Sequence, residues 1–279
     1  MKWSGRQGSG NVEDRRGMGG RVAIGGGLGG LVILLLSLFF GNGDFSSDDL
    51  NINTGAGNEN YTPTEEENEN AQFVSVVLKD TEDVWHEIFQ EQGSDYEEPH
   101  LVLFTGSTDS GCGYANAAVG PFYCPADSKV YIDLSFYDDL QQRFGAPGDF
   151  AMAYVVAHEV GHHVQNLLGT SAKIDAMRGR LDEKQMNALS VKLELQADFY
   201  AGVWANRAQK MKDILDAGDI DEALNAANAI GDDKLQKESQ GYVVPDAFTH
   251  GTSKQRMYWF KRGFETGDIS QGNTFDEVD

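Results

Sequence analysis

Residues 151–168 constrain the fold more than any other segment of the chain. Most of their side chains are apolar, and Glu159 is the only Asp, Glu, Lys or Arg among them. A segment of this composition predicts a core helix, which we place over residues 148–168. A carboxylate buried in such a helix needs a partner or a metal ion, because burying it alone is very costly. The segment therefore predicts a packed domain and a chemical role within its core.

Two histidines flank this carboxylate in the pattern H-E-x-x-H, formed by His158, Glu159 and His162. Positions i and i+4 share one face of a helix, so both imidazoles can bind a single ion. Zinc suits two neutral imidazoles and takes four ligands. Glu159 beside it can accept a proton from the metal-bound water. His163 lies about 100° around the helix from His162, so we assign it to packing or to a hydrogen bond behind the site.

A catalytic zinc needs a third protein ligand and an open position for water. The mostly apolar segment 193–204 contains two acids, Glu194 and Asp198, again at positions i and i+4. We predict Glu194 as the third ligand to one zinc ion per chain. Asp198 would accept the second ring N–H of a ligand histidine and so fix its orientation. The swapped assignment, with Asp198 on the metal and Glu194 behind it, stays open.

The remaining pattern predicts an α+β fold that is predominantly helical, with a small sheet. Apolar residues at helical spacing between Phe73 and Phe89 predict a first helix. Residues 106–125 are rich in Gly and Pro, which is typical of a loop. Short apolar runs predict strands at 101–104 and 130–134. Further helices are predicted over 135–143, 148–168, 181–210, 219–230 and 253–264.

Charge divides the chain into unequal parts. Residues 1–21 carry five basic and two acidic side chains, residues 22–40 carry no charge, and residues 41–70 are acidic and rich in Gly and Asn. The uncharged stretch is just long enough to cross a bilayer, with a cleaved signal peptide as the alternative. We predict a cytoplasmic basic head, a transmembrane anchor over 22–40, a flexible linker and a folded domain over 71–279. The positive-inside rule places that domain outside the cytoplasm, in a single-pass membrane protein.

Composition also limits the partners of the chain. Its 22 basic and 44 acidic side chains give a formal charge of −22, which argues against nucleic acid as a partner. The lipid bilayer is the partner predicted for residues 22–40. The only two cysteines, Cys112 and Cys124, lie in the Gly- and Pro-rich loop, and an oxidising compartment would let them form a disulfide. A nucleophilic or metal-binding thiol is the alternative.

H-E-x-x-H followed about thirty residues later by E-x-x-x-D resembles the gluzincin metallopeptidases. The whole chain resembles the bacterial family of putative neutral zinc metallopeptidases, the YpfJ-like proteins. The segments that carry this resemblance are the Met1-Lys2-Trp3 start with Arg15-Arg16-Gly17, the single apolar span, Gly111–Ala115, Gly120–Pro125, the HEVGHHVQ and ELQAD segments, and His250–Arg256.

The resemblance implies a zincin-like core in a bacterial, membrane-anchored, extracytoplasmic endopeptidase that acts on a peptide or protein. It also implies that a strand beside the site pairs with the extended substrate. Residues 129–134 are the candidate, with a fully paired interior strand as the alternative. Such a hydrolase needs a donor for the developing oxyanion. We nominate His250, with Tyr200 and Tyr242 as rivals and a capping or surface role for His250 as the alternative.

A protein of another class is also compatible with the sequence. It is a catalytically inactive, membrane-anchored binding or scaffold protein that keeps zinc only for its structure. Both proteins contain the same metal, so peptide cleavage that depends on Glu159 separates them.

Overall fold

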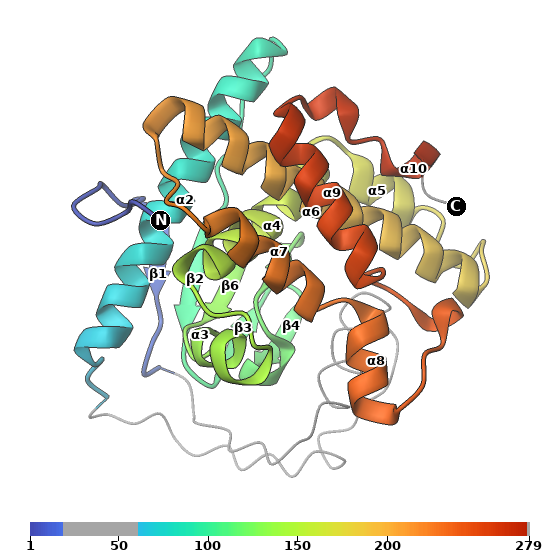
Figure 1. Cartoon of the computed structure of the whole chain (residues 1–279), viewed down its shortest axis with the longest axis horizontal. Coiled ribbons are helices and arrows are strands. Elements are labelled where there is room, and N and C mark those ends of the chain that lie inside the picture. Colours follow the sequence, from blue (N-terminus) through green and yellow to red (C-terminus); the bar gives the residue numbers. More distant parts are fainter. Residues whose placement is uncertain (19–60, 278–279) are drawn as a thin grey trace.

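The computed structural model describes residues 1–18 and 61–277, which form a largely helical body with a small mixed sheet (Figure 1). The strand order in the sheet is β1-β2-β6-β5. Strands β1 and β6 run parallel to β2, and β5 runs antiparallel to β6. A separate antiparallel hairpin pairs β3 with β4 inside the segment predicted as a loop. The strands are β1 (Val12–Asp14), β2 (His100–Phe104), β3 (Ser107–Ser110), β4 (Gly113–Asn116), β5 (Phe122–Cys124) and β6 (Lys129–Asp133).

The predominantly helical character and the four longest predicted helices after the sheet are confirmed, with ends within two residues of those expected. The segment 135–143 forms the short α3 and a π-helical turn, η2. The helices are α2 (Glu65–Glu91), α3 (Phe136–Asp138), α4 (Asp149–Leu167), α5 (Thr170–Asp175), α6 (Glu183–Lys212), α7 (Asp219–Ala229), α8 (Asp232–Gln240), α9 (Ser253–Thr266) and α10 (Thr274–Glu277). The short turns are η1 (Ala117–Val119), η2 (Asp139–Arg143), η3 (Pro245–Ala247) and η4 (Ile269–Gln271).

Residues 1–18 belong to the same folded body as the rest. Strand β1 pairs with β2, and the Met1 amino group lies 2.7 Å from Oδ1 of Asp149 at the start of α4. Among the described residues, no helix has the length and apolar composition that crossing a bilayer requires. The predicted anchor, residues 22–40, lies outside them. The predictions of an N-terminal transmembrane helix and of a single-pass protein in the bacterial cell membrane are therefore corrected, because one crossing would separate residues 1–18 from the domain against which they pack.

Helix α2 begins inside the segment predicted as an acidic linker. Thr64 and Glu67 form a capping box, in which each side chain accepts a hydrogen bond from the backbone N–H of the other residue. The acidic residues 65–67 occupy the first turn, where the partial positive charge of the helix start favours them. The acidic run thus starts a helix instead of forming a solvated tether.

Helix α4 is the core helix that its composition predicts. Every residue from Phe150 to Gly161 is buried, and the helix packs against α2, α6 and α7. Gly161 permits the close approach of α6, because a Cβ at this position would lie 3.0 Å from the backbone oxygen of Ala197. This approach places the second half of α4 against the middle of α6.

Strand β6 confirms the strand predicted at 130–134, but not the role expected for it. It pairs with β2 on one side and with β5 on the other. The prediction that residues 129–134 offer a free edge to a substrate is therefore wrong. In the described part of the sheet, β5 is the edge strand next to β6. Its three residues are too few to show an alternating pattern, so the sequence did not predict this strand.

Candidate metal centre

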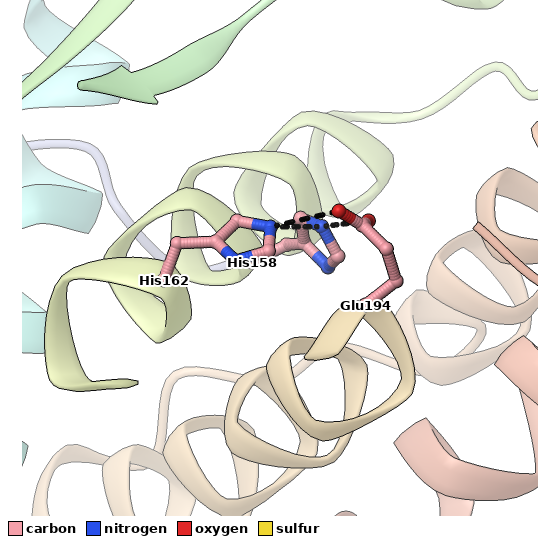
Figure 2. A group of neighbouring side chains, drawn as sticks. All are labelled: His158, His162 and Glu194. Carbon is pink, nitrogen blue, oxygen red and sulfur yellow. Dashed lines mark hydrogen bonds and ion pairs between the residues drawn. The ribbon is translucent and has the colours of Figure 1, made fainter. Parts of the chain in front are cut away.

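Helices α4 and α6 bring His158, His162 and Glu194 together (Figure 2). Nε2 of His158 lies 3.2 Å from Nε2 of His162 and 3.2 Å from Oε2 of Glu194. Nε2 of His162 lies 3.4 Å from Oε1 of Glu194. The three residues that the sequence nominated as metal ligands therefore converge, although two separate helices supply them.

These separations fit a zinc ion. With tetrahedral geometry and ligand bonds of 2.0–2.2 Å, neighbouring ligand atoms lie about 3.3 Å apart. Two imidazoles and one carboxylate form a ligand set found in catalytic zinc sites, which leaves a fourth position for water. The side chains of His158 and Glu194 are 7% and 3% exposed, so bulk water competes little for the ligand atoms.

The charge of the surroundings also favours a cation. Glu159, Glu194 and Asp198 are three buried carboxylates, and Arg256 is the buried guanidinium that accompanies them. Burial acts to lower the pKa of His158, but Asp198 and Glu194 outweigh it and raise that pKa to about 10. These carboxylates thus favour a positive charge at His158, in a place where a divalent ion would balance them.

Asp198 lies behind His158, with Oδ1 2.8 Å from Nδ1 of the ring. The Tyr154 hydroxyl donates to the same oxygen at 2.6 Å, and Arg256 donates to both carboxylate oxygens at 2.8 and 3.0 Å. Burial acts to raise the pKa of Asp198, but the charges of Arg256 and His158 lower it overall. Because Asp198 contacts the ring nitrogen that faces away from the other ligands, the swapped assignment does not fit this geometry.

The sequence analysis missed Tyr154 and Arg256. Tyr154 lies one turn before His158 on the same helix face, so its spacing could have indicated a contact. Arg256 is 58 positions from Asp198, and only the packing of α9 against α6 brings the two together. A basic residue near the start of a helix carries no local sign of such a partner.

Glu159 lines the same cavity as the three converging residues. Burial raises the pKa of Glu159, and the neighbouring charges of His158 and His162 oppose that shift only in part. A carboxyl group with a raised pKa beside a metal site is suited to taking up and returning a proton.

The cavity beside the metal centre has a volume of about 240 Å³. One side is formed by the end of η1, the loop at Gly120 and Pro121, and β5. The cavity combines a polar centre with largely apolar walls, which is typical of ligand-binding sites. Apolar side chains in its lining include Val119, Phe122, Phe136, Phe144, Val155, Ile230 and Leu235.

His250 also lines the cavity, and Asp232 at the start of α8 holds its ring. Nδ1 of His250 lies 3.1 Å from Oδ1 of Asp232. The other oxygen of Asp232 accepts backbone N–H groups from Thr249, His250 and Gly251. Nε2 is therefore the ring nitrogen left for a ligand in the cavity. The sequence analysis missed Asp232 because α8 was not predicted.

The two rivals of His250 lie elsewhere. Tyr200 is buried with its ring centroid 5.4 Å from that of Trp85, and Tyr242 is 61% exposed. Neither belongs to the described residues that line the cavity, so the geometry favours His250 over both.

Two further contacts fix β5 beside the site. His163 does not reach the metal centre: its Nε2 lies 2.6 Å from the Glu97 carbonyl oxygen and its Nδ1 3.1 Å from the Tyr123 hydroxyl. The predicted disulfide between Cys112 and Cys124 is present, with an S–S distance of 2.08 Å. It joins the turn between β3 and β4 to the end of β5. Both contacts hold the strand that borders the cavity.

Comparison with known proteins agrees with this geometry. The family model described as "Putative neutral zinc metallopeptidase" matches residues 1–275. The Escherichia coli (strain K12) protein "Uncharacterized protein YpfJ" is 50% identical over 286 residues, covering 99% of each chain. The Mycobacterium tuberculosis (strain ATCC 25618 / H37Rv) protein "Uncharacterized protein Rv2575" is 44% identical over 196 residues, 66% of this chain and 64% of the relative. No solved structure matches the chain. The matched range contains all residues of the candidate metal centre, and the chain belongs to the putative neutral zinc metallopeptidase family.

Proposed function

We propose that this chain is a zinc-dependent endopeptidase that hydrolyses peptide bonds in a peptide or protein substrate. The observation that carries the proposal is the convergence of His158, His162 and Glu194 at a cavity that Glu159 also lines. These three residues would hold one zinc ion, which when bound polarises a carbonyl group and lowers the pKa of water.

Glu159 acts as the general base and then as the general acid. Its carboxylate takes a proton from the water whose oxygen attacks the carbonyl carbon. The C–N bond then breaks, and Glu159 returns the proton to the leaving nitrogen. Burial supports this exchange because it raises the pKa of Glu159.

His250 supplies the hydrogen-bond donor for the oxygen that becomes negative during attack. Burial acts to lower its pKa, but Asp232 and then Glu194 raise it overall. The ring is therefore favoured as an imidazolium, with the Nδ1 proton on Asp232 and the Nε2 proton available to the substrate. Such donors typically contribute 10²–10³ in kcat.

Strand β5 replaces residues 129–134 as the strand proposed to bind substrate. It lies at the edge of the described sheet and borders the cavity. An extended peptide can pair with such an edge through its main chain while its side chains enter neighbouring pockets. A strand edge alongside the site supports cleavage within a chain, which is why we propose an endopeptidase.

A purely structural zinc is less well supported. Structural zinc sites have four protein ligands, whereas catalytic sites keep one position open. Among the described residues, the group around His158 offers three candidate ligands, and its open side faces the cavity.

The test compares the wild-type chain with Glu159→Gln, using Glu265→Gln as the control because Glu265 is exposed on α9. Zinc content is measured by elemental analysis, and activity by cleavage of a fluorescence-quenched peptide library. We expect Glu159→Gln to keep its zinc and to cleave the peptides about 10²–10⁴-fold more slowly. We expect His158→Ala to lose the metal. Full activity in Glu159→Gln would refute the general-base role. A zinc-loaded wild type that cleaves nothing would favour structural zinc.

A further inference from the structure

Gln165 makes a contact with the metal centre to which the proposed mechanism assigns no role. It lies one turn after His162 on α4 and is fully buried. Its Oε1 lies 2.9 Å from Nδ1 of His162. This nitrogen is on the opposite side of the ring from Nε2, which faces Glu194 and His158.

The two other contacts of Gln165 fix which way its amide points. Nε2 of Gln165 donates to the carbonyl oxygen of Leu193 at 2.7 Å and to Oε1 of Gln196 at 3.1 Å. Gln196 in turn donates from its own Nε2 to the carbonyl oxygen of Gly272 at 3.1 Å. A flipped Gln165 amide would set its oxygen against the Leu193 oxygen and leave two acceptors facing each other. The chain of contacts therefore presents an acceptor to His162.

An acceptor at Nδ1 decides the state of the imidazole. It holds the ring proton on Nδ1 and leaves the lone pair of Nε2 directed toward the other ligand atoms. The same amide is hydrogen-bonded to the carbonyl oxygen of Leu193, the residue before Glu194. Gln165 thus connects the second histidine to the backbone that carries the carboxylate ligand.

We propose that Gln165 is the positioning residue of His162: its amide, oriented by Leu193 and Gln196, holds the ring in the tautomer and direction that bind zinc. The inference rests on the proposed zinc site. In this proposal, the neutral amide of Gln165 orients His162 as the carboxylate of Asp198 orients His158.

The experiment uses the full chain and three variants: Gln165→Met, Gln196→Met and Gln209→Met. Methionine keeps the length and much of the volume of glutamine but removes the amide. Gln209 is the matched control because both ends of its amide are also hydrogen-bonded, to Asp213 and to the Leu215 N–H near the end of α6. The Zn²⁺ dissociation constant is measured by competition with a chelator, ligand geometry by the visible spectrum of the Co²⁺ form, and folding by the thermal midpoint.

We expect Gln165→Met to weaken Zn²⁺ binding 10- to 100-fold and to alter the Co²⁺ spectrum. Gln196→Met should weaken it measurably but by less than tenfold, because Gln165 then keeps only one of its two orienting contacts, the one to Leu193, and Gln209→Met should leave it unchanged. A lower thermal midpoint with wild-type zinc affinity in Gln165→Met would show a merely structural role and overturn the inference. If Gln165→Met does not fold, unchanged affinity in Gln196→Met overturns it instead. A wild type without zinc affinity would overturn the metal centre itself.

Discussion

Two histidine–aspartate pairs lie beside the same cavity and differ in what else binds the aspartate. Nδ1 of His158 is 2.8 Å from Asp198, and Nδ1 of His250 is 3.1 Å from Asp232. Asp198 is also bound by the guanidinium of Arg256. Asp232 instead accepts three backbone N–H groups, which carry no net charge.

This difference suits the two histidines to different chemistry. Because Arg256 balances Asp198, the ring of His158 can lose its proton to a metal ion without leaving a buried carboxylate unpaired. Among the described residues, no guanidinium is hydrogen-bonded to Asp232, whose charge outweighs burial and raises the pKa of His250. We assign one pair to a metal ligand and the other to a hydrogen-bond donor, and Arg256 on Asp198 is the feature that distinguishes the two pairs.

Among the variants of these two pairs, removal of the Arg256 guanidinium should cause the largest loss in the free energy of unfolding. In Arg256→Met, Asp198 stays buried without the guanidinium that binds both of its oxygens, and we expect a loss of about 3–5 kcal/mol in the free energy of unfolding. Urea unfolding of the metal-free protein measures this. The control Arg262→Met breaks a surface pair with Glu277, for which about 1 kcal/mol or less is expected. Equal losses in the two variants would mean that Arg256 does not compensate Asp198.

The pH dependence of activity tests the second pair. The imidazolium of His250 is present below its pKa and is lost as pH rises through that value, so kcat/KM should fall on the alkaline side. Asp232 raises this pKa; in Asp232→Asn the fall should therefore begin at lower pH. His250→Gln should remove this limb and lower kcat by about 10²–10³, with zinc content unchanged. An alkaline limb that does not move in Asp232→Asn would separate His250 from the reaction.

The sequence predicted the parts of the site that depend on helical spacing. His158 and His162 share a face because they are four residues apart, and the same holds for Glu194 and Asp198. The apolar segment around the histidines predicted the core helix, so the candidate ligands were assigned to segments that the structure shows as helices α4 and α6. The mostly apolar surroundings of Glu194 also indicated a buried acid rather than a surface one.

Contacts between distant segments could not be predicted in this way. Strand β1 has only three residues, two of them acidic, and its pairing with β2 depends on a partner almost ninety positions away. Helix α8 is polar over most of its length, so its pattern did not mark Asp232 as the partner of His250. The acidic start of α2 was predicted as a linker because composition alone does not distinguish a capped helix start from a solvated run.

The smallest loss in unfolding free energy is expected when the hydroxyl of Tyr154 is removed. This hydroxyl and the guanidinium of Arg256 both donate to Asp198, so the variant distinguishes their contributions. Tyr154→Phe removes one neutral donor but leaves Arg256 and His158 on the carboxylate. We expect a loss of about 1 kcal/mol in unfolding free energy and less than a tenfold change in zinc affinity, with Tyr258→Phe, an exposed site on α9, as the control. Urea unfolding and chelator competition measure the two quantities. If Tyr154→Phe costs as much as Arg256→Met, the hydrogen bond rather than the charge stabilises Asp198. The two histidine–aspartate pairs would then no longer differ in the way that assigns one to metal binding and the other to hydrogen-bond donation.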